Sequence, residues 1–224
     1  ILGAAVAYQI VALEKLGWLA ALGLTVVLAC VMGVLMERMI MLPIKLSGSR
    51  NAWIIATLAA ALIFQSVFNL RYFDVDALRP SPVVTGGFEL AGITVEWQEI
   101  LAIAVALLVM GAYDLFLQRS AYGRAIRATA HSPDTSVLMG IPVQRIVVLS
   151  FVIAAVITAI AGLLAAPVIF VAPAAGLMFT IKGFTAAVIG GVGSPRGALL
   201  GGVIVGMLDT VVRSVVGGSA GNFA

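Results

Sequence analysis

Two charged residues, Lys182 and Asp209, interrupt the last two long apolar runs of this sequence. A charge left alone at the centre of a membrane-spanning helix costs roughly 2.5–3.5 kcal/mol. This cost predicts that both side chains are buried in a helix bundle, where the ammonium and the carboxylate would pair across neighbouring helices. Such a pair would serve either as a structural contact or as a gate on a translocation path.

Three more residues that could do chemistry, Arg124, Arg127 and His131, follow one another at positions i, i+3 and i+7. This spacing places them on one face of a helix, where the arginines could pair with charges of another protein. The alternative is an ordinary basic loop that touches lipid headgroups. Small residues elsewhere on this helix permit close approach of a partner; they are Ala125, Ala128 and Thr129.

A second short helix is expected directly after the first. Ser132 followed by Pro133 is a helix start signal, because serine caps the first turn and proline fits its first position. Gly140 is a natural C-cap for this helix, after the apolar residues 137–139. The two helices are expected to lie at the membrane surface, within the connection 118–145.

Other residues of the apolar runs could line a path or simply pack. Gln65 and Asn69, four positions apart, could form either a polar path or hydrogen bonds between helices. Asp114 is expected to snorkel or to meet Arg119. Glycines near the end of the chain allow close helix approach or a broken helix that lines a cavity. They are Gly190, Gly191 and Gly193, and Gly197, Gly201 and Gly202 continue a small-residue face.

The sequence indicates no cofactor and no enzymatic activity of its own. His131 is the only histidine and Cys30 the only cysteine, so these residue types cannot assemble a metal cluster. The glycine-rich stretch 190–197 is not a phosphate-binding loop, because no Gly-Lys-Ser/Thr follows at the required spacing. Any ATP hydrolysis that drives this protein is therefore expected in a partner.

These residues must be positioned by helices in a membrane. The chain has 224 residues, of which 62% are hydrophobic and 10% charged, with a net charge of +3. A soluble domain carries about 25% charged residues, so most of this surface must face lipid. The cations form no stripe that would bind nucleic acid. We therefore expect an all-α, polytopic transmembrane helix bundle, with residues 1–224 as one transmembrane domain.

Uncharged or nearly uncharged runs of about 20 residues mark the spans. Six spans and a remnant are expected; they are 16–36, 51–70, 100–117, 145–170, 176–193 and 197–214, with the remnant at 1–13. The sequence starts at Ile1 inside an apolar run and stops among glycines and small residues. We therefore expect it to be truncated at both ends.

The connections between the spans carry unequal charge. Three Lys or Arg residues lie in 37–50 and four in 118–145, against two in 71–99. Because cytoplasmic loops carry the excess of cations, we expect the connections 37–50 and 118–145 to lie in the cytoplasm. The connection 71–99 is then an external loop. An alternating stretch at 88–95 in the external loop is expected to form a small hairpin.

Four stretches of the sequence resemble branched-chain amino-acid ABC importer permeases, in order and in spacing. Gly123-Arg-Ala-Ile-Arg-Ala128, followed by Leu138-Met-Gly-Ile141, is similar to the cytoplasmic coupling loop of that family. The other three are Glu37-Arg38 with Leu42-Pro43-Ile44, Ile55-Ala-Thr57 with Phe64-Gln65, and Lys182 to Ser194 followed by Gly197 and Gly201-Gly202. The resemblance covers essentially the whole chain and favours the shorter of the two permeases that such importers pair.

This resemblance implies a permease subunit of an ATP-driven, binding-protein-dependent importer of branched-chain amino acids in the bacterial inner membrane. Its partners would be a homologous permease subunit, cytoplasmic ATP-binding subunits and a periplasmic or extracellular substrate-binding protein. Residues 123–141 would dock onto the ATPase and transmit its closure to the spans. The residues concerned are Gly123, Arg124, Ala125, Arg127, Ala128, His131, Leu138, Gly140 and Ile141.

Other functions stay open at this point. The scarcity of intramembrane charge and the glycine-rich helices are compatible with a stand-alone channel or facilitator for a small neutral solute such as urea. The coupling-loop pattern favours the importer, because a facilitator does not need it. Relatives of these permeases also import urea, short amides or sugars, so the same machine could carry another substrate.

Overall fold

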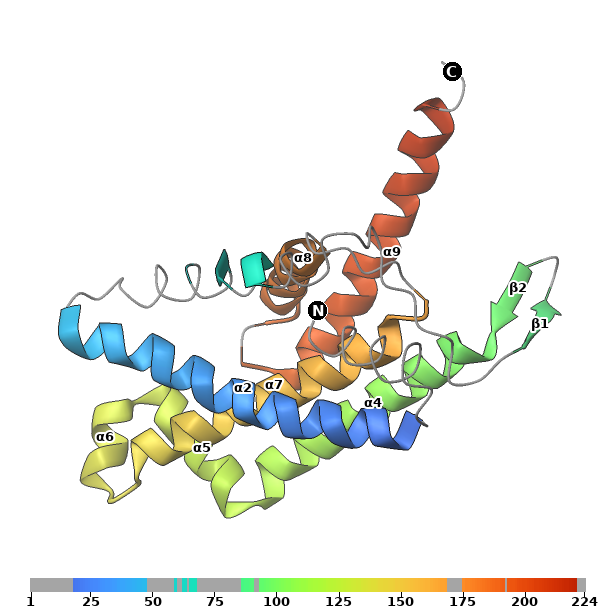
Figure 1. The fold of residues 1–224 in the computed structure, drawn as a ribbon. Helices are drawn as coiled ribbons and strands as arrows, with labels where there is room; N and C mark the ends of the chain where they lie inside the picture. Colours follow the sequence, from blue (N-terminus) through green and yellow to red (C-terminus); the bar gives the residue numbers. More distant parts are fainter. Residues whose placement is uncertain are drawn as a thin grey trace.

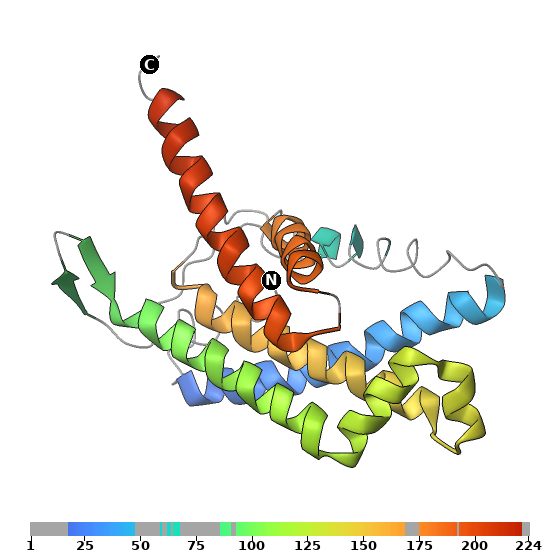
Figure 2. The same ribbon diagram turned by 180° about the vertical axis from the view of Figure 1, so that it is seen from behind.

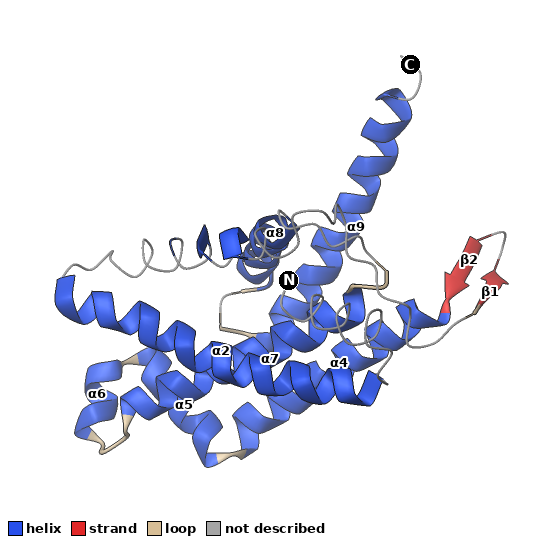
Figure 3. Cartoon of the chain, viewed as in Figure 1, coloured by secondary structure: helices blue, strands red, loops and turns tan. Residues whose placement is uncertain are grey.

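The computed structural model describes residues 18–47, 59, 62–63, 65–67, 86–90, 93–168, 175–191 and 193–220. In chain order its elements are α2 (Trp18–Ser47), β1 (Gly87–Leu90), β2 (Ile93–Glu96), α4 (Trp97–Arg119), α5 (Ala121–His131), α6 (Pro133–Leu138), α7 (Val143–Ala165), α8 (Ala175–Gly190) and α9 (Pro195–Ala220). Helices dominate the described residues, and one small hairpin is the exception (Figure 3). The expected helical fold class is confirmed.

Four described helices are long and apolar enough to cross a membrane: Ala20–Met39 in α2, Trp97–Arg119, Val143–Ala165 and Pro195–Val212 in α9. They coincide with four of the expected spans. The expected remnant 1–13 and most of the expected span 51–70 lie outside the described residues. α8 ends at Gly190, before the expected limit at 193, because Gly191 has a φ of +93° and leaves the helical region.

The first described helix is longer than the sequence predicted. We expected a connection over 37–50, but α2 continues to Ser47. Arg38, Met39, Met41 and Leu42 after Glu37 are good helix formers, and the helix continues past Pro43 to end just before Gly48. Glu37 consequently lies within the helix and is 1% exposed, with its Oε2 atom 3.9 Å from Nε of Arg38.

α2 packs along α7 through a stripe of mostly small residues. The two helices lie side by side and run in opposite directions (Figures 1 and 2). Gly33 marks a close approach, because a Cβ there would lie 2.8 Å from Cα of Val152. Small side chains allow two backbones to come this close in a membrane. The stripe consists of every fourth residue, and all five are buried: Ala21, Thr25, Ala29, Gly33 and Glu37.

α4, α8 and α9 complete the bundle. α4 contacts both α7 and α9, while α8 packs on α9. The distal half of α9 extends away from the other helices toward the C-terminus (Figure 1). α4 and α9 expose many large apolar side chains, as helices do when they face lipid or another membrane protein.

The hairpin lies at one end of α4, and α5 and α6 lie at the other end (Figure 2). β1 pairs antiparallel with β2, with Gly87 opposite Glu96, which confirms the hairpin expected at 88–95. The backbone N–H of Trp97 donates to the carbonyl of Gly86 at 3.1 Å. The hairpin is thereby fixed directly to the first turn of α4.

Candidate functional site

A tight corner joins α4 to α5. Only Ser120 separates the two helices, and its Oγ accepts a hydrogen bond from the backbone N–H of Gly123 at 2.8 Å. Gly123 is buried, and a Cβ at this position would collide with the carbonyl of Phe116 and the backbone of Leu117. The corner therefore depends on serine as the helix cap and on glycine three residues later.

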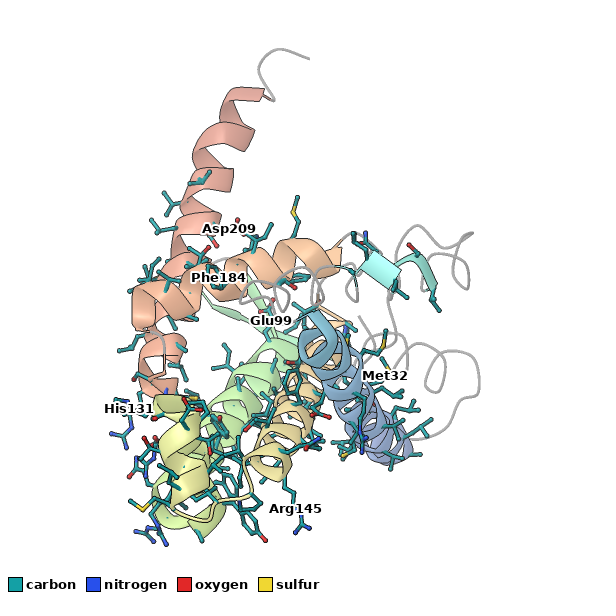
Figure 4. All side chains as sticks on the ribbon, turned by 90° about the vertical axis from the view of Figure 1, so that its left-hand side faces the viewer. Met32, Glu99, His131, Arg145, Phe184 and Asp209 are labelled. Atoms are coloured by element: carbon teal, nitrogen blue, oxygen red, sulfur yellow. The ribbon has the colours of Figure 1, made fainter. Side chains whose placement is uncertain are left out.

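The predicted face of α5 is present. Arg124, Arg127 and His131 are exposed along this helix, as is Ala128, whereas Ala125 is half-buried. Figure 4 shows His131 at the outer edge of the short helices. The spacing argument for this face is confirmed, and docking of another protein onto it stays a prediction.

The expected caps of α6 are also present. The Oγ of Ser132 accepts a hydrogen bond from the backbone N–H three residues later at 3.4 Å, and proline occupies the first helical turn. Gly140 has a φ of +77°. Its N–H donates to the carbonyl of Val137, and the N–H of Ile141 donates to the carbonyl of Ser136. These two bonds form a Schellman ending, which turns the chain sharply after α6.

Apolar side chains are exposed where α6 ends. Leu138 is 88% exposed and Met139 is 78% exposed. Adjacent apolar side chains left open in this way mark a surface that another protein or a membrane covers. Together with the arginine face of α5 they form one projecting unit, residues 121–139, which we call the surface helix pair.

The predicted ion pair between the last two helices is present. Nζ of Lys182 lies 2.9 Å from Oδ2 of Asp209 and joins α8 to α9. The two side chains are 35% and 36% exposed. The burial that we expected is therefore only partial, because α8 and α9 lie at the edge of the described bundle. Figure 4 shows Asp209 close to the crossing of these two helices, near Phe184.

Three glycines bring α8 and α9 together. A Cβ at Gly190 would collide with the backbone of Gly197, and a Cβ at Gly201 would collide with the carbonyl of Ala186. The expectation of close helix approach is confirmed for these positions. Gly202 was expected on the same face, but a Cβ there would meet nothing within 4 Å. One residue along a helix corresponds to a rotation of about 100°, which turns this glycine away from α8.

Gly191 and Gly193 build the turn between α8 and α9. Their φ angles of +93° and +92° are rarely adopted by residues with a side chain, so the turn itself favours glycine here. Gln65 is half-buried, and Asn69 lies outside the described residues. A polar path that involves Gln65 and Asn69 therefore stays a prediction.

The sequence reasoning missed a second charged contact. Oδ2 of Asp114 accepts hydrogen bonds from Nε and Nη2 of Arg196 at 2.9 and 2.7 Å. Nε2 of Gln118 donates to the same oxygen at 2.8 Å. We expected Asp114 to snorkel or to meet Arg119; the pairing with Arg119 was wrong, because Arg196 at the start of α9 lies within reach. The sequence did contain a clue to this pairing. Asp114 is near the end of the expected span 100–117 and Arg196 directly precedes the span 197–214, so both charges were expected near the same side of the membrane.

These polar residues form electrostatic contacts between helices. In the part of the chain that the structure describes, no group of three or more His, Cys, Asp or Glu residues could hold a metal ion. Both ion pairs join α9 to another helix, one near its start and one farther along. Contacts of this kind can be made and broken when helices move.

Comparison with known proteins places the chain in a family. Residues 1–222 match the family described as branched-chain amino acid transport system / permease component. The chain is 33% identical over 204 residues to the high-affinity branched-chain amino acid transport system permease protein BraD of Pseudomonas aeruginosa, covering 89% of this chain and 66% of BraD. It is 32% identical over 203 residues to the corresponding protein LivH of Escherichia coli K12, covering 87% of this chain and 66% of LivH.

A shorter stretch of the chain is similar to a permease whose name gives a different substrate. The fructose import permease protein FrcC of Rhizobium meliloti is 35% identical over 104 residues, which cover 43% of this chain and 29% of FrcC. Among solved structures, none matches this chain. The chain spans 66% of the length of BraD and LivH. With its apolar helices and the family match over nearly all of its residues, the chain is a multi-pass membrane protein that belongs to the family of branched-chain amino acid transport system permease components.

Proposed function

We propose that this protein is a membrane-spanning permease subunit of an ATP-driven, binding-protein-dependent importer of branched-chain amino acids. Its assembly would include a homologous permease subunit, cytoplasmic ATP-binding subunits and an external substrate-binding protein. The names of BraD and LivH support the substrate. The observation that carries the mechanism is the surface helix pair, which projects from one end of the bundle (Figure 1).

The surface helix pair suits a protein partner better than lipid headgroups alone. It presents arginines on α5 and an exposed apolar tip at Leu138 and Met139, so it offers both charge pairing and apolar burial. Its two short helices have defined caps at Ser120, Ser132 and Gly140, so a partner would meet a preformed surface. A preformed surface lowers the entropy cost of binding.

The end of the molecule that carries this pair is the proposed cytoplasmic end. The connection 118–145 holds four of the thirteen Lys and Arg residues of the chain, which supports this orientation in the bacterial inner membrane. The hairpin at the opposite end of α4 would then face outward. ATP hydrolysis belongs to the partner subunits, and closure of these subunits would push the surface helix pair.

The proposed translocation path runs beside α8 and α9. Lys182 and Asp209 are partly exposed within membrane-spanning segments, and charges in such positions normally face a protein interface or a water-filled cavity. The turn at Gly190, Gly191 and Gly193 would be a hinge at the cytoplasmic end of that path. Gln65 and Asn69 would contribute polarity from another span.

Affinity purification of the full-length protein from native membranes in mild detergent tests this proposal. Mass spectrometry should identify ATP-binding subunits with the unchanged protein. Reversal of two charges in Arg124→Glu/Arg127→Glu should reduce their recovery. The charge-preserving pair Arg124→Lys/Arg127→Lys is the matched control and should retain most of it. Recovery of the chain alone, with solute passing through liposomes that lack ATP, would identify a facilitator and overturn the proposal.

The similarity to FrcC supports a sugar as the second candidate substrate. Uptake of labelled leucine by the reconstituted importer, with unlabelled valine, fructose or urea as competitor, separates the possibilities. Competition by valine alone is expected. Competition by fructose or urea without competition by valine would reassign the substrate and leave the importer mechanism intact.

A further inference from the structure

Asp114 and Arg196 connect two elements that are far apart in the sequence. The residues are 82 positions apart, and the guanidinium donates two hydrogen bonds to one carboxylate oxygen. Gln118, one turn after Asp114 on α4, donates a third bond to the same oxygen. A carboxylate oxygen that accepts three bonds is fixed in direction as well as in distance. The contact therefore ties α4 to α9 at a defined geometry.

On the α4 side, the contact lies close to the surface helix pair. Asp114 is six residues before Ser120, which is less than two helical turns. The corner at Ser120 and Gly123 leaves no loop between α4 and α5. The guanidinium of Arg124 also donates to the carbonyl of Arg119 at 3.2 Å, across this corner. Movement of α5 must therefore displace the end of α4 instead of being absorbed by a flexible connection.

On the other side, the contact reaches the first turn of α9. Arg196 is the second residue of this helix and follows the turn that contains Gly191 and Gly193. Farther along α9, Asp209 pairs with Lys182 of α8. A displacement of Arg196 would therefore move α9 relative to its turn and would act on the second ion pair.

The contact is open on one side. The guanidinium of Arg196 is 75% exposed, whereas the carboxylate of Asp114 is half-buried at 18%. An ion pair with one open partner is not enclosed by packing, so it can be broken and remade during a transport cycle. While it is formed, its directed bonds set the relative position of α4 and α9.

We propose that the Asp114–Arg196 contact passes movement of the surface helix pair to the α8–α9 pair. Both residues are positioning residues for transport, because they act through α9 and need not touch the substrate. The inference rests on the proposed importer function. It adds the route by which the ATPase motion reaches the charged pair at Lys182 and Asp209.

The test uses the complete importer, reconstituted in liposomes with its ATP-binding subunits and its binding protein. ATP hydrolysis and leucine uptake are measured on the same vesicles, so the amount of substrate moved per ATP is obtained. Asp114→Asn and Arg196→Gln should each lower this ratio about fivefold or more, the lower end of typical coupling between sites. Hydrolysis itself should continue, because docking of the ATPase is not disturbed.

Two further variants separate transmission from a loss of structure. Arg119→Gln removes a neighbouring exposed charge at the same end of α4 and should leave the ratio unchanged. The exchanged pair Asp114→Arg/Arg196→Asp should recover part of the ratio, because the contact is restored with its polarity reversed. Size-exclusion chromatography of each variant reports whether the importer is still assembled.

Three results would overturn the inference. A parallel fall of hydrolysis and uptake with an intact assembly would show that the contact does not transmit movement. Loss of the assembly in Asp114→Asn and Arg196→Gln, but not in Arg119→Gln, would make the contact a structural brace. Failure of the unchanged protein to recruit ATP-binding subunits would instead remove the proposed function, and this inference with it.

Discussion

The α2–α7 pair and the α8–α9 pair both bring backbones into close contact, but they do so along different lengths. In α2, a buried stripe from Ala21 to Glu37 follows α7 for more than four turns. In the α8–α9 pair, the glycines at which a Cβ would collide with the facing backbone are all near the turn; they are Gly190, Gly197 and Gly201. Beyond them the described contact between α8 and α9 includes an ion pair.

This difference indicates different mechanical roles. The buried stripe of α2 is made mostly of small residues, and at Gly33 the backbone comes very close to Val152, so shape dominates the described part of the α2–α7 interface. The α8–α9 interface is fixed by shape at the turn and by charge farther out. Packed cores resist gradual deformation, whereas a charged contact can switch between two partners. We therefore regard α2–α7 as the scaffold and α8–α9 as the movable pair.

Substitutions near the turn between α8 and α9 should lower the stability of the protein more than substitutions elsewhere in the two helix pairs. Gly190→Leu places a side chain against the backbone of Gly197 and should cost more than the usual 1–3 kcal/mol or so of overpacking, because a backbone cannot yield by rotating a side chain. Thermal unfolding of the purified protein in detergent measures the effect. Gly202→Leu, at a position with open space, is the matched control and should unfold near the original temperature.

Neutralising one residue of the Lys182–Asp209 pair should cause the next largest loss of stability. Lys182→Met or Asp209→Leu alone leaves the other charge without this partner in an apolar helix and should lower stability by up to about 2.5–3.5 kcal/mol. The double variant Lys182→Met/Asp209→Leu should lose less than either single variant, because no charge then needs compensation. An additive loss in thermal unfolding of the three proteins would contradict the pairing and weaken the comparison.

The scaffold should respond to small changes of shape. Gly33→Ala adds a methyl group 2.8 Å from Cα of Val152, so α2 and α7 must separate slightly, at a cost of about 1–3 kcal/mol. Gly23→Ala, in the same helix but with nothing nearby, should be neutral or slightly stabilising. Equal unfolding temperatures for these two variants would show that the α2–α7 interface is looser than described.

The smallest effect is expected at a buried hydroxyl of the scaffold. Oγ1 of Thr25 is buried and has no hydrogen-bond partner among the described residues. Thr25→Val keeps the shape and removes this unsatisfied group, so stability should rise by about 1 kcal/mol. A fall in unfolding temperature would indicate that the hydroxyl is needed, and shape would then no longer suffice to explain the α2–α7 interface.

The features that the sequence predicted well depend on neighbouring residues or on scarce ones. The caps at Ser132 and Gly140 need only a few adjacent residues, so their signals are local. Lys182 and Asp209 could be matched because the last two expected spans each contain one charge in their interior. The face of Arg124, Arg127 and His131 followed from helical periodicity alone.

The features that were missed depend on distances through space. The pairing of Asp114 with Arg196 needed the packing of α4 on α9, and a nearby Arg119 offered a simpler but wrong partner. The length of α2 was underestimated because a charge at Glu37 was taken as the end of a span, although the carboxylate is buried. Which glycines touch α8 depended on the rotation of α9, which the sequence pattern does not fix.

The bond between Trp97 and Gly86 makes the hairpin an extension of α4. α4 has 23 residues and is therefore about 34 Å long. A rigid rod of this length acts as a lever, so a small tilt imposed near Ser120 becomes a displacement several times larger than that seen near the corner. In the proposed orientation, spectroscopic labels on the hairpin would thus report, from the outer face of the membrane, a movement that begins at the cytoplasmic face.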